Sequence, residues 1–351
     1  MIAHRIVFPE ANRVDFEAEE LPPPGPGQAL LRTLFSLVSA GTELTLLAGG
    51  HPPGSFWASY GCYPVRPGFG QVAEVVAVGP GVEGIESGNR VLSSGGHRSA
   101  SIVPTSKLHL LPPDVYPEEA VFHTIGAGVV SALHLGQLGL GDAVAVVGLG
   151  LLGQLAVRLA RLAGARPIVA VDLASERLDV ARAGGATSAI SPQSTDVRAE
   201  VERLTRGRMA DLVFEMTGSP DAIPMAIGLA RAQGRYVQVG CPRGKTELDF
   251  HEAVLLPGLH VVGALFARQG SQETPESPWS LRRNTELFLD LIQDGSLDVA
   301  SLITHRYTWR EAPAAYAMLQ AERARALGVL LDWSEDHEEL ARQPAKPKGS
   351  F

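Results

Sequence analysis

The amino-acid sequence predicts an α/β protein in which a doubly wound parallel sheet is joined to a second, mostly β domain. From about residue 118 onward, apolar strands alternate with helical segments. Near-continuous apolar strands in such an alternation are typical of a parallel sheet that helices cover on both faces. Residues 1–120 are instead rich in Gly and Pro, with short β-type runs between turn residues, which favours a compact, irregular β body.

Size, charge and cysteine content limit the possible functions. The 351 residues are enough for two domains with a sizeable core. The net charge is −8 and no lysine- or arginine-rich block stands out, which argues against nucleic acid or an anionic membrane as a partner. The two cysteines, Cys62 and Cys241, are too few for a disulfide framework or a four-cysteine zinc lobe within one chain.

No segment has the pattern of a targeting signal or a membrane span. The N-terminal residues MIAHRIVFPE lack the charged-then-apolar order of a secretory signal. The most apolar stretch, residues 143–157, is interrupted by glycines and by Gln154 and is too short to cross a membrane. We therefore expect a soluble, cytoplasmic protein.

The individual elements follow from periodicity and flanking turn residues. In the β body, strands are expected at residues 29–37, 70–78, 90–92 and 100–103. Helical spacing begins after Pro117 and continues to residue 138. The strands of the parallel sheet are expected at residues 143–147, 168–171, 188–190, 212–215, 235–239 and 260–265. Helices are expected near residues 151–163, 175–183, 197–205, 220–231, 251–257, 281–293 and 311–321, before a last strand at 328–332.

A glycine-rich turn, GLGLLG at residues 148–153, stands between a predicted strand and a predicted helix. In this context Gly148 permits a tight turn, Gly150 lets the backbone approach a pyrophosphate, and Gly153 lets helix and strand lie close together. The helix N-terminus, at Leu151 and Leu152, presents free N–H groups and a positive dipole end to phosphates. We interpret the segment as a dinucleotide-binding site.

Asp172 ends the next predicted strand, roughly 20 residues after the glycine turn. A carboxylate at this place accepts hydrogen bonds from the adenosine ribose and repels a 2′-phosphate, so NAD is favoured over NADP. We assign Arg177 to the same site. The competing interpretation is a glycine-rich turn of an unrelated α/β fold, with Asp172 as a helix cap.

The order of these parts resembles the medium-chain dehydrogenase/reductase family. Besides the glycine turn, the resemblance rests on four segments: GNRV at residues 88–91, EMTG at 215–218, GRYVQVG at 234–240 and LITH at 302–305. It implies a Rossmann NAD-binding domain and a GroES-like catalytic domain. It also assigns Thr217, in the second of these segments, to the cofactor site. Val239 and Gly240 are assigned to the same site because the backbone corresponding to residues 234–240 lies along the nicotinamide ribose in relatives.

The resemblance also divides the chain into expected domains. The N-terminal part of the catalytic domain is expected at residues 1–122 and the NAD-binding domain at 123–266. Residues 267–334 are expected to return to the catalytic domain, and 335–351 to form a disordered tail. Relatives pair the edge strand that corresponds to residues 260–265 across a two-fold axis, so a homodimer or homotetramer is expected.

Zinc-type relatives carry three catalytic metal ligands that this sequence lacks. The first falls in their Cys-x-Thr/Ser-Asp turn, which corresponds to Ala40-Gly41-Thr42-Glu43 here; the others correspond to Phe69 and to a position near Ala127. Ala and Phe offer no metal donor, so we expect no zinc.

Without zinc, oxidation of an alcohol needs a side-chain base. Thr42 corresponds to the hydroxyl that relays the proton in relatives, and Glu43 is a base or an orienting carboxylate. His97 and His123 are the candidate imidazole bases; either can instead be a hydrogen-bonded structural histidine. The sequence does not decide among these three acceptors. His51 and His134 are weaker candidates.

The predicted activity is a zinc-independent, NAD-dependent oxidoreductase acting on a secondary alcohol or ketone. Aromatic and basic residues near the expected cleft suit a polar substrate such as a polyol, cyclitol or sugar derivative; they are Phe56, Trp57, Tyr60, Trp279, Arg282 and Arg283. The alternatives are an NAD(P)H-dependent quinone or enone reductase, and a cofactor-binding protein without catalysis.

Overall fold

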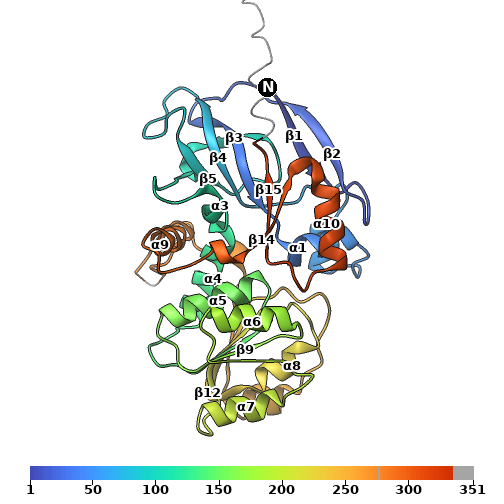
Figure 1. The fold of residues 1–351 in the computed structure, drawn as a ribbon, viewed down its shortest axis with the longest axis vertical. Helices are drawn as coiled ribbons and strands as arrows, with labels where there is room; N and C mark the ends of the chain where they lie inside the picture. Colours follow the sequence, from blue (N-terminus) through green and yellow to red (C-terminus); the bar gives the residue numbers. More distant parts are fainter. Residues whose placement is uncertain (276, 335–351) are drawn as a thin grey trace, which may run out of the picture. The chain divides into compact units, whose positions relative to one another are not determined.

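A computed structural model describes residues 1–275 and 277–334, which form two compact units. Unit 1 contains Met1–Val121, His305–Ala321 and the described residues from Val329 onward. Unit 2 contains Phe122–Thr304 and Glu322–Gly328. Figure 1 shows the helices and strands of each unit. None of the helices formed by the described residues is long and apolar enough to cross a bilayer.

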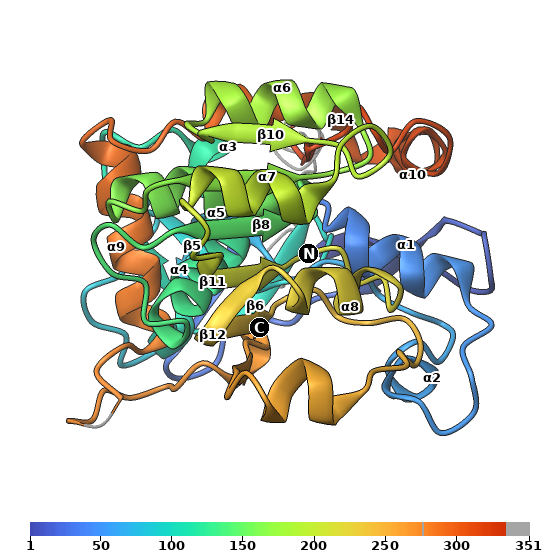
Figure 2. The same cartoon turned by 90° about the horizontal axis from the view of Figure 1, so that it is seen from below.

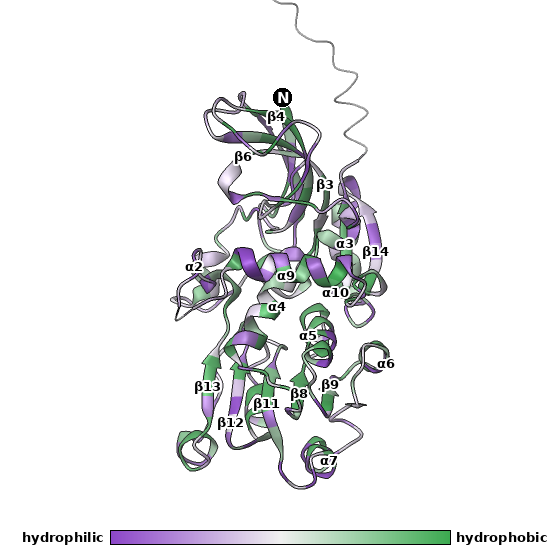
Figure 3. Ribbon diagram, turned by 90° about the vertical axis from the view of Figure 1, so that its left-hand side faces the viewer, coloured by the Kyte–Doolittle hydropathy of each residue, from purple (hydrophilic) through white to green (hydrophobic). Residues whose placement is uncertain are grey.

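Unit 2 is built on a six-stranded sheet in which all neighbouring strands run parallel. In spatial order the strands are β10 (Ser188–Ile190), β9 (Ile168–Val171), β8 (Val144–Val147), β11 (Ala210–Glu215), β12 (Ala230–Gln238) and β13 (His260–Gly263). Numbered within the sheet, this is the order 3-2-1-4-5-6 of a Rossmann fold. Figure 3 shows β13, β12, β11, β8 and β9 side by side. The predicted doubly wound parallel sheet is confirmed.

Helices connect the strands of this sheet (Figure 2): α5 (Leu151–Leu162), α6 (Ser175–Ala183), α7 (Val197–Leu204) and α8 (Ala222–Ile227). Every residue of β8 and β9 is buried, which explains why these strands are apolar throughout instead of alternating. Val147, Val169, Val213 and Tyr236 belong to one apolar cluster of the unit. Each such buried side chain contributes about 1.5–3 kcal/mol relative to an exposed one.

Unit 1 contains a separate β hairpin and a seven-stranded sheet, in which the strands from β15 to β7 pair antiparallel with their neighbours. The hairpin consists of β1 (Ile2–Val7) and β2 (Asp15–Glu20). The sheet order is β14 (Ile303–Thr308), β15 (Gly328–Asp332), β3 (Gln28–Leu37), β4 (Gln71–Val78), β5 (Arg90–Ser93) and β7 (His109–Leu110), and β6 (Ala100–Pro104) also pairs with β3. The C-terminal β15 pairs with β3, so residues 30 and 330 belong to one sheet. The predicted mostly β domain is confirmed.

Three expected elements differ from the structure. The helix expected over 118–138 is interrupted after α3 (Pro117–Ala120), and α4 (His123–Leu135) begins separately. The helix expected over 220–231 is shorter, because β12 already begins at Ala230 and pairs with β11. Residues 40–43, which correspond to a turn in zinc-type relatives, are helical here: they begin α1 (Ala40–Ala48), and Glu43 accepts a hydrogen bond from the N–H of Ser39 just before the helix.

The compact units also divide the chain differently from the expected domains near residue 267. The segment up to Thr304 belongs to unit 2, and His305 begins the return to unit 1. The reason is α9 (Leu281–Gln293), which lies against α4. A Cβ added at Gly126 of α4 would overlap the ring of Phe288 of α9, so the glycine allows a very close approach. The remaining α-helices are α2 (Phe56–Tyr60) and α10 (Ala312–Ala321), and the helix expected near 251–257 is a short π-helix at His251–Leu255. The predicted tail 335–351 lies outside the described residues.

Candidate functional site

The glycine-rich turn of unit 2 connects β8 to α5 and depends on the absence of side chains at two positions. Gly148 has φ of +93°, and a Cβ there would lie 2.7 Å from a side-chain atom of Thr217. A Cβ at Gly153 would overlap the carbonyl oxygen of Gly148. Gly150, in contrast, has no atom within 4 Å of the place of its Cβ. The turn is therefore closely packed at Gly148 and Gly153 and open at Gly150, which is the arrangement that a pyrophosphate requires.

The first turn of α5 supplies the donors beside this open space. The initial N–H groups of a helix, here those of Leu151, Leu152 and Gly153, have no partner within the helix. They carry the positive end of the helix dipole, which favours a phosphate group. The residues present fit the pyrophosphate of a dinucleotide.

Asp172 follows β9 directly and is joined to the glycine turn. Its Oδ2 atom accepts a hydrogen bond of 2.6 Å from the N–H of Leu149, and its Oδ1 atom accepts one of 2.9 Å from the N–H of Ala174. Arg177 lies nearby, with its Nη1 atom 3.9 Å from Oδ2 of Asp172. The structure thus brings the predicted Asp172 and Arg177 together at the carboxyl end of β9.

Glu215 is the last residue of β11 and is buried. It accepts hydrogen bonds from the three predicted residues Thr217, Val239 and Gly240. Its carboxylate accepts hydrogen bonds from both the N–H and the hydroxyl of Thr217. Its carbonyl oxygen accepts the N–H groups of Val239 and Gly240 at 2.9 and 2.8 Å. Sequence reasoning used Glu215 only as part of a family motif, although a carboxylate ending an apolar strand is itself a signal of a buried hydrogen-bonding role.

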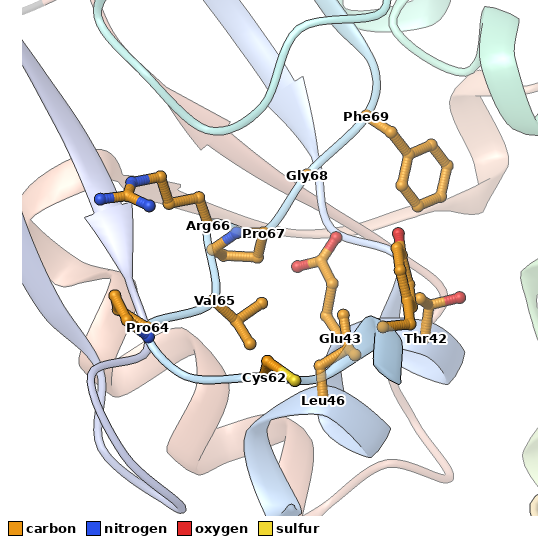
Figure 4. Close-up of a pocket in the computed structure, with 11 residues that line it drawn as sticks. Thr42, Glu43, Leu46, Cys62, Pro64, Val65, Arg66, Pro67, Gly68 and Phe69 are labelled. Atoms are coloured by element: carbon orange, nitrogen blue, oxygen red, sulfur yellow. The ribbon is translucent and has the colours of Figure 1, made fainter. Parts of the chain in front are cut away.

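In unit 1, Thr42 and Glu43 of α1 line a cavity of about 170 Å³. Figure 4 shows both side chains together with Phe69, which comes from the loop before β4. Cys62 and Arg66 also contribute to the wall. Thr42 is half-buried, whereas only 1% of Glu43 is exposed.

Glu43 and His97, two of the predicted catalytic residues, lie in one buried hydrogen-bond network. Oε2 of Glu43 accepts hydrogen bonds from Nε2 of His97 at 3.1 Å and from the hydroxyl of Tyr316 at 2.5 Å. Oε1 of Glu43 accepts the N–H of Ser39 at 2.8 Å. Because an ionised carboxylate only accepts, Nε2 of His97 carries the proton.

The network continues on the other side of the imidazole ring. Nδ1 of His97 is 2.8 Å from the hydroxyl of Ser36, which accepts a hydrogen bond of 2.9 Å from Nε1 of Trp333. Tyr316, Ser36 and Trp333 were not predicted, because no local pattern links these distant positions to residue 43.

Electrostatics keeps Glu43 ionised in this setting. Burial alone raises the pKa of the Glu43 carboxyl, but the charge of His97 and the hydrogen bonds from His97, Tyr316 and Ser39 outweigh it, so that the pKa lies below its usual value. Burial and the neighbouring Glu43 raise the pKa of Tyr316 well above its usual value, so Tyr316 acts as a donor. Glu43 is therefore an ionised acceptor of hydrogen bonds from His97, Tyr316 and Ser39.

The other histidines lie elsewhere. His123 begins α4 in unit 2, where it is buried with its ring nitrogens 3.4 Å from the hydroxyl of Thr124. His51 is tilted against Trp57 at 6.0 Å, and His134 stacks on Trp279 at 3.8 Å. Of the candidate histidines, the structure joins His97 to Glu43 by a hydrogen bond.

The three positions that correspond to zinc ligands hold no donor. Ala40 begins α1, Phe69 lines the cavity, and Ala127 is buried in the middle of α4. In the part of the chain that the structure describes, no group of three or more His, Cys, Asp or Glu residues is arranged to hold a metal. These residues do not fit the zinc site of zinc-type relatives.

Comparisons with known proteins agree with this architecture. The sequence model of a family described as "Zinc-binding dehydrogenase" matches residues 152–281, which contain none of the three positions discussed above. The L-threonine 3-dehydrogenase of Pyrococcus furiosus is 26% identical over 322 residues, covering 82% of this chain and 86% of that protein. The D-guloside 3-dehydrogenase of Escherichia coli K12 is 30% identical over 256 residues, covering 70% of this chain and 71% of that protein.

Solved structures share the fold. A zinc-binding dehydrogenase from Sinorhizobium meliloti 1021 bound to NADP has a TM-score of 0.77 at 22% identity, covering 95% of this chain and 99% of that one. An alcohol dehydrogenase from Escherichia coli CFT073 in complex with NADH has a TM-score of 0.78 at 20% identity, covering 94% and 99%. With its Rossmann sheet order, its glycine turn and a 30% identical dehydrogenase aligned over most of both chains, the chain belongs to the medium-chain dehydrogenase/reductase family of oxidoreductases.

Proposed function

We propose that this protein is a zinc-independent dehydrogenase that transfers a hydride between NAD and a polar secondary alcohol or ketone. The observation that carries the proposal is the glycine turn tied by the Leu149–Asp172 hydrogen bond to the end of β9, in a chain whose relatives are alcohol dehydrogenases. A nicotinamide cofactor supplies the hydride acceptor or donor when it is bound. The residues described below bind and orient it, or handle the proton of the substrate.

The cofactor would extend along the carboxyl ends of the strands of unit 2. Gly148, Gly150 and Gly153, with the N–H groups of Leu151 and Leu152, would hold the pyrophosphate. Asp172 and Arg177 would face the adenosine ribose. Thr217, Val239 and Gly240, held by the buried Glu215, would support the nicotinamide ribose.

The preference for NAD rests on the carboxylate of Asp172, which would repel a 2′-phosphate. One observation favours NADP as a second candidate. Arg323 interacts electrostatically with Arg177, Arg243 and Asp172, so several positive charges lie in this region. Burial, together with the charges of Arg243 and Arg177, lowers the pKa of Arg323, while Asp172 acts in the opposite direction. We assign NAD because Asp172 itself lies at the loop and accepts two backbone hydrogen bonds there.

The proton of the substrate hydroxyl would be handled by α1. Thr42 is the catalytic residue in this proposal, since its half-buried side chain lines the cavity and its hydroxyl can both donate and accept. Glu43 and His97, which are hydrogen-bonded to each other, are the proposed acceptors of the proton from Thr42. His123 is the alternative acceptor.

A polar substrate fits the residues around the cavity. Tyr60 lines it, and the ring of Phe56 stacks on Tyr60 at 5.3 Å. Phe56 is 59% and Tyr60 50% exposed, and such aromatic faces suit the C–H surface of a sugar or cyclitol ring. The named substrates of the two relatives above, L-threonine and a D-guloside, also carry several polar groups.

Activity measurements on the purified protein test the proposal directly. The reduction of NAD and of NADP is followed at the nicotinamide absorbance with a panel of polyols, cyclitols, sugars, glycosides and L-threonine, with and without a metal chelator. We expect oxidation of at least one polyhydroxylated substrate with NAD, unaffected by the chelator. A protein that reduces quinones or enones with NADPH and oxidises no alcohol of the panel would contradict the proposal.

A further inference from the structure

Unit 2 contains a cavity of its own, and its wall includes none of the residues assigned to the cofactor. It has a volume of about 460 Å³ and is formed by α5, α6 and the segment that follows α9. The helices α5 and α6 lie side by side (Figure 1). The polar residues of its wall are Arg158, Arg161, Ser296, Asp298 and Ser301. None of them was assigned to the cofactor or the substrate above.

Arg158 is the buried charge of this cavity, with 9% of its surface exposed. Its Nη1 atom donates to the carbonyl and the side-chain oxygens of Gln154, both at 3.3 Å, and Nη2 donates to the hydroxyl of Ser301 at 3.5 Å. All three hydrogen bonds are long, and a guanidinium has five N–H donors. No carboxylate lies within 4.0 Å of Arg158 among residues 1–275 and 277–334.

A buried guanidinium without a close counter-charge is costly. Burial lowers the pKa of Arg158, and the more distant Asp298 partly opposes this effect. Arginine nevertheless remains charged at neutral pH. The C-terminal end of α6 offsets part of the cost, because the negative end of its dipole faces the two arginines.

The end of α6 also holds both arginine side chains in place. A Cβ added at Gly184 would lie 2.5 Å from Nη1 of Arg158. Gly185 has φ of +104°, and a Cβ there would overlap the side chain of Arg161. The two arginines therefore pack against bare backbone, which limits the entropy that they lose when they bind a ligand.

We propose that this cavity is a binding site for a small molecule that carries an oxyanion next to a hydroxyl group. Arg158 and Arg161 would bind the oxyanion, since a guanidinium matches carboxylate and phosphate oxygens with two parallel hydrogen bonds. The negative charge of Asp298 would repel a ligand that carries only negative charge, but its carboxylate can accept a hydrogen bond from the ligand's hydroxyl. One of its oxygens, Oδ1, already accepts the N–H of Ser301 at 3.0 Å. The inference is independent of the proposed dehydrogenase function.

The site is connected to the cofactor turn through one buried side chain. Gln154 accepts from Arg158 and donates through Nε2 to the carbonyl oxygens of Leu149 and Arg177, at 3.2 and 2.8 Å. Leu149 in turn donates to Asp172. A ligand that draws Arg158 toward itself would weaken its bonds to Gln154, and through them the turn that carries the glycines.

Calorimetric titration with two probes tests the site. Inorganic phosphate and malate are titrated into the wild-type protein and into R158K, R161Q and R203Q. Arg203 is an exposed arginine of α7 that pairs with Glu200 and serves as the matched control. Circular dichroism establishes that each variant is folded, and Arg161 is exposed enough for its replacement to leave the fold intact.

We expect at least one probe to bind with millimolar or better affinity, unchanged in R203Q and weakened about tenfold or more in R161Q and R158K, as expected for the loss of a charge-assisted hydrogen bond. Binding of phosphate alone would identify a phosphorylated ligand, and binding of malate alone a hydroxy acid. Equal affinity in R161Q and wild type would place the probe elsewhere, for example at the glycine turn, and overturn the inference. Absence of binding of both probes at millimolar concentrations would also overturn it.

Discussion

Glu43 accepts a hydrogen bond from Nε2 of His97 across 3.1 Å, although 54 residues separate them in the sequence and both are 1% exposed. The pair is further bonded to Tyr316 and to Ser36. The carboxylate of Glu43 is thereby held by donors from three segments of the chain.

Replacing Thr42 with Val should lower the turnover of alcohol oxidation by about 10²–10⁴, the usual effect of removing a proton-transfer group. The dissociation constant of NAD should hardly change, because the residues assigned to the cofactor lie in unit 2. Steady-state kinetics and cofactor titration measure the two effects. Thr45→Val is the matched control, since Thr45 lies on the same helix and its hydroxyl donates to the carbonyl of Gly41. A T42V enzyme with wild-type turnover would remove Thr42 from the mechanism.

Replacing Glu43 with Gln should destabilise the protein by about 3–5 kcal/mol at neutral pH, as expected when one partner of a buried charged pair is removed. The pKa of Glu43 in the folded protein lies below its usual value. The stabilisation by the ionised carboxylate is therefore complete above the unfolded pKa, about 4.3, and is lost as the pH falls through the lower folded pKa. Urea unfolding of the wild type and of E43Q at several pH values measures this stabilisation.

The difference in unfolding free energy between wild type and E43Q should thus be constant near neutrality and shrink in acid. Tyr316→Phe provides a graded comparison, because it removes one hydrogen bond to Glu43 and leaves the bond to His97. It should cost less than E43Q, about 1–3 kcal/mol. A difference that grows toward low pH would show that Glu43 is protonated in the folded protein.

NAD should bind at least about tenfold more tightly than NADP, which corresponds to about 1.4 kcal/mol. Asp172→Ser should narrow this difference, because the arginines near Asp172 then act on a 2′-phosphate without an opposing carboxylate. Glu176→Ser is the control: its carboxylate is exposed on α6 and pairs with Arg325. Calorimetry with both cofactors decides the matter, and equal wild-type affinities would refute the role assigned to Asp172.

Elemental analysis of the purified protein should find far less than one zinc ion per chain. The reason is the chemistry at Ala40, Phe69 and Ala127, none of which supplies a metal donor. Prolonged dialysis against a chelator should leave alcohol oxidation unchanged. One zinc per chain retained after dialysis would mean that these positions are aligned wrongly with the ligands of zinc-type relatives.

A homodimer or homotetramer is expected from the edge strand β13. It is the last strand of the six-stranded sheet, and Val261 and Leu265 are 49% and 43% exposed at and just beyond it. An open apolar edge invites pairing with a second copy across a two-fold axis. Light scattering should report at least a dimer for the wild type and a smaller assembly for V261K. A monomeric wild type at micromolar concentration would contradict the expectation.

Local sequence was sufficient to predict the parallel sheet and its cofactor turn. The buried strands β8 and β9 are apolar at each position, and Gly148, Gly150 and Gly153 stand at the strand–helix junction. Ile168–Val171, Ser188–Ile190 and Leu281–Gln293 have the predicted bounds. In these segments, the period of the apolar residues and the steric freedom of glycine act over a few residues, so the information is present in the segment itself.

Tertiary structure decided the surroundings of Glu43. Residues 40–43 were compatible both with the turn of zinc-type relatives and with the helix α1 that buries Glu43, because the local pattern is too short to distinguish the two structures. Burial of the carboxylate is tolerable only when donors satisfy it, and these come from His97 and Tyr316, 54 and 273 positions away. The close contact of Gly126 with Phe288, which keeps α9 in unit 2, likewise joins residues far apart in the chain. Such contacts depend on the three-dimensional packing of distant segments, and no periodicity within one segment reveals them.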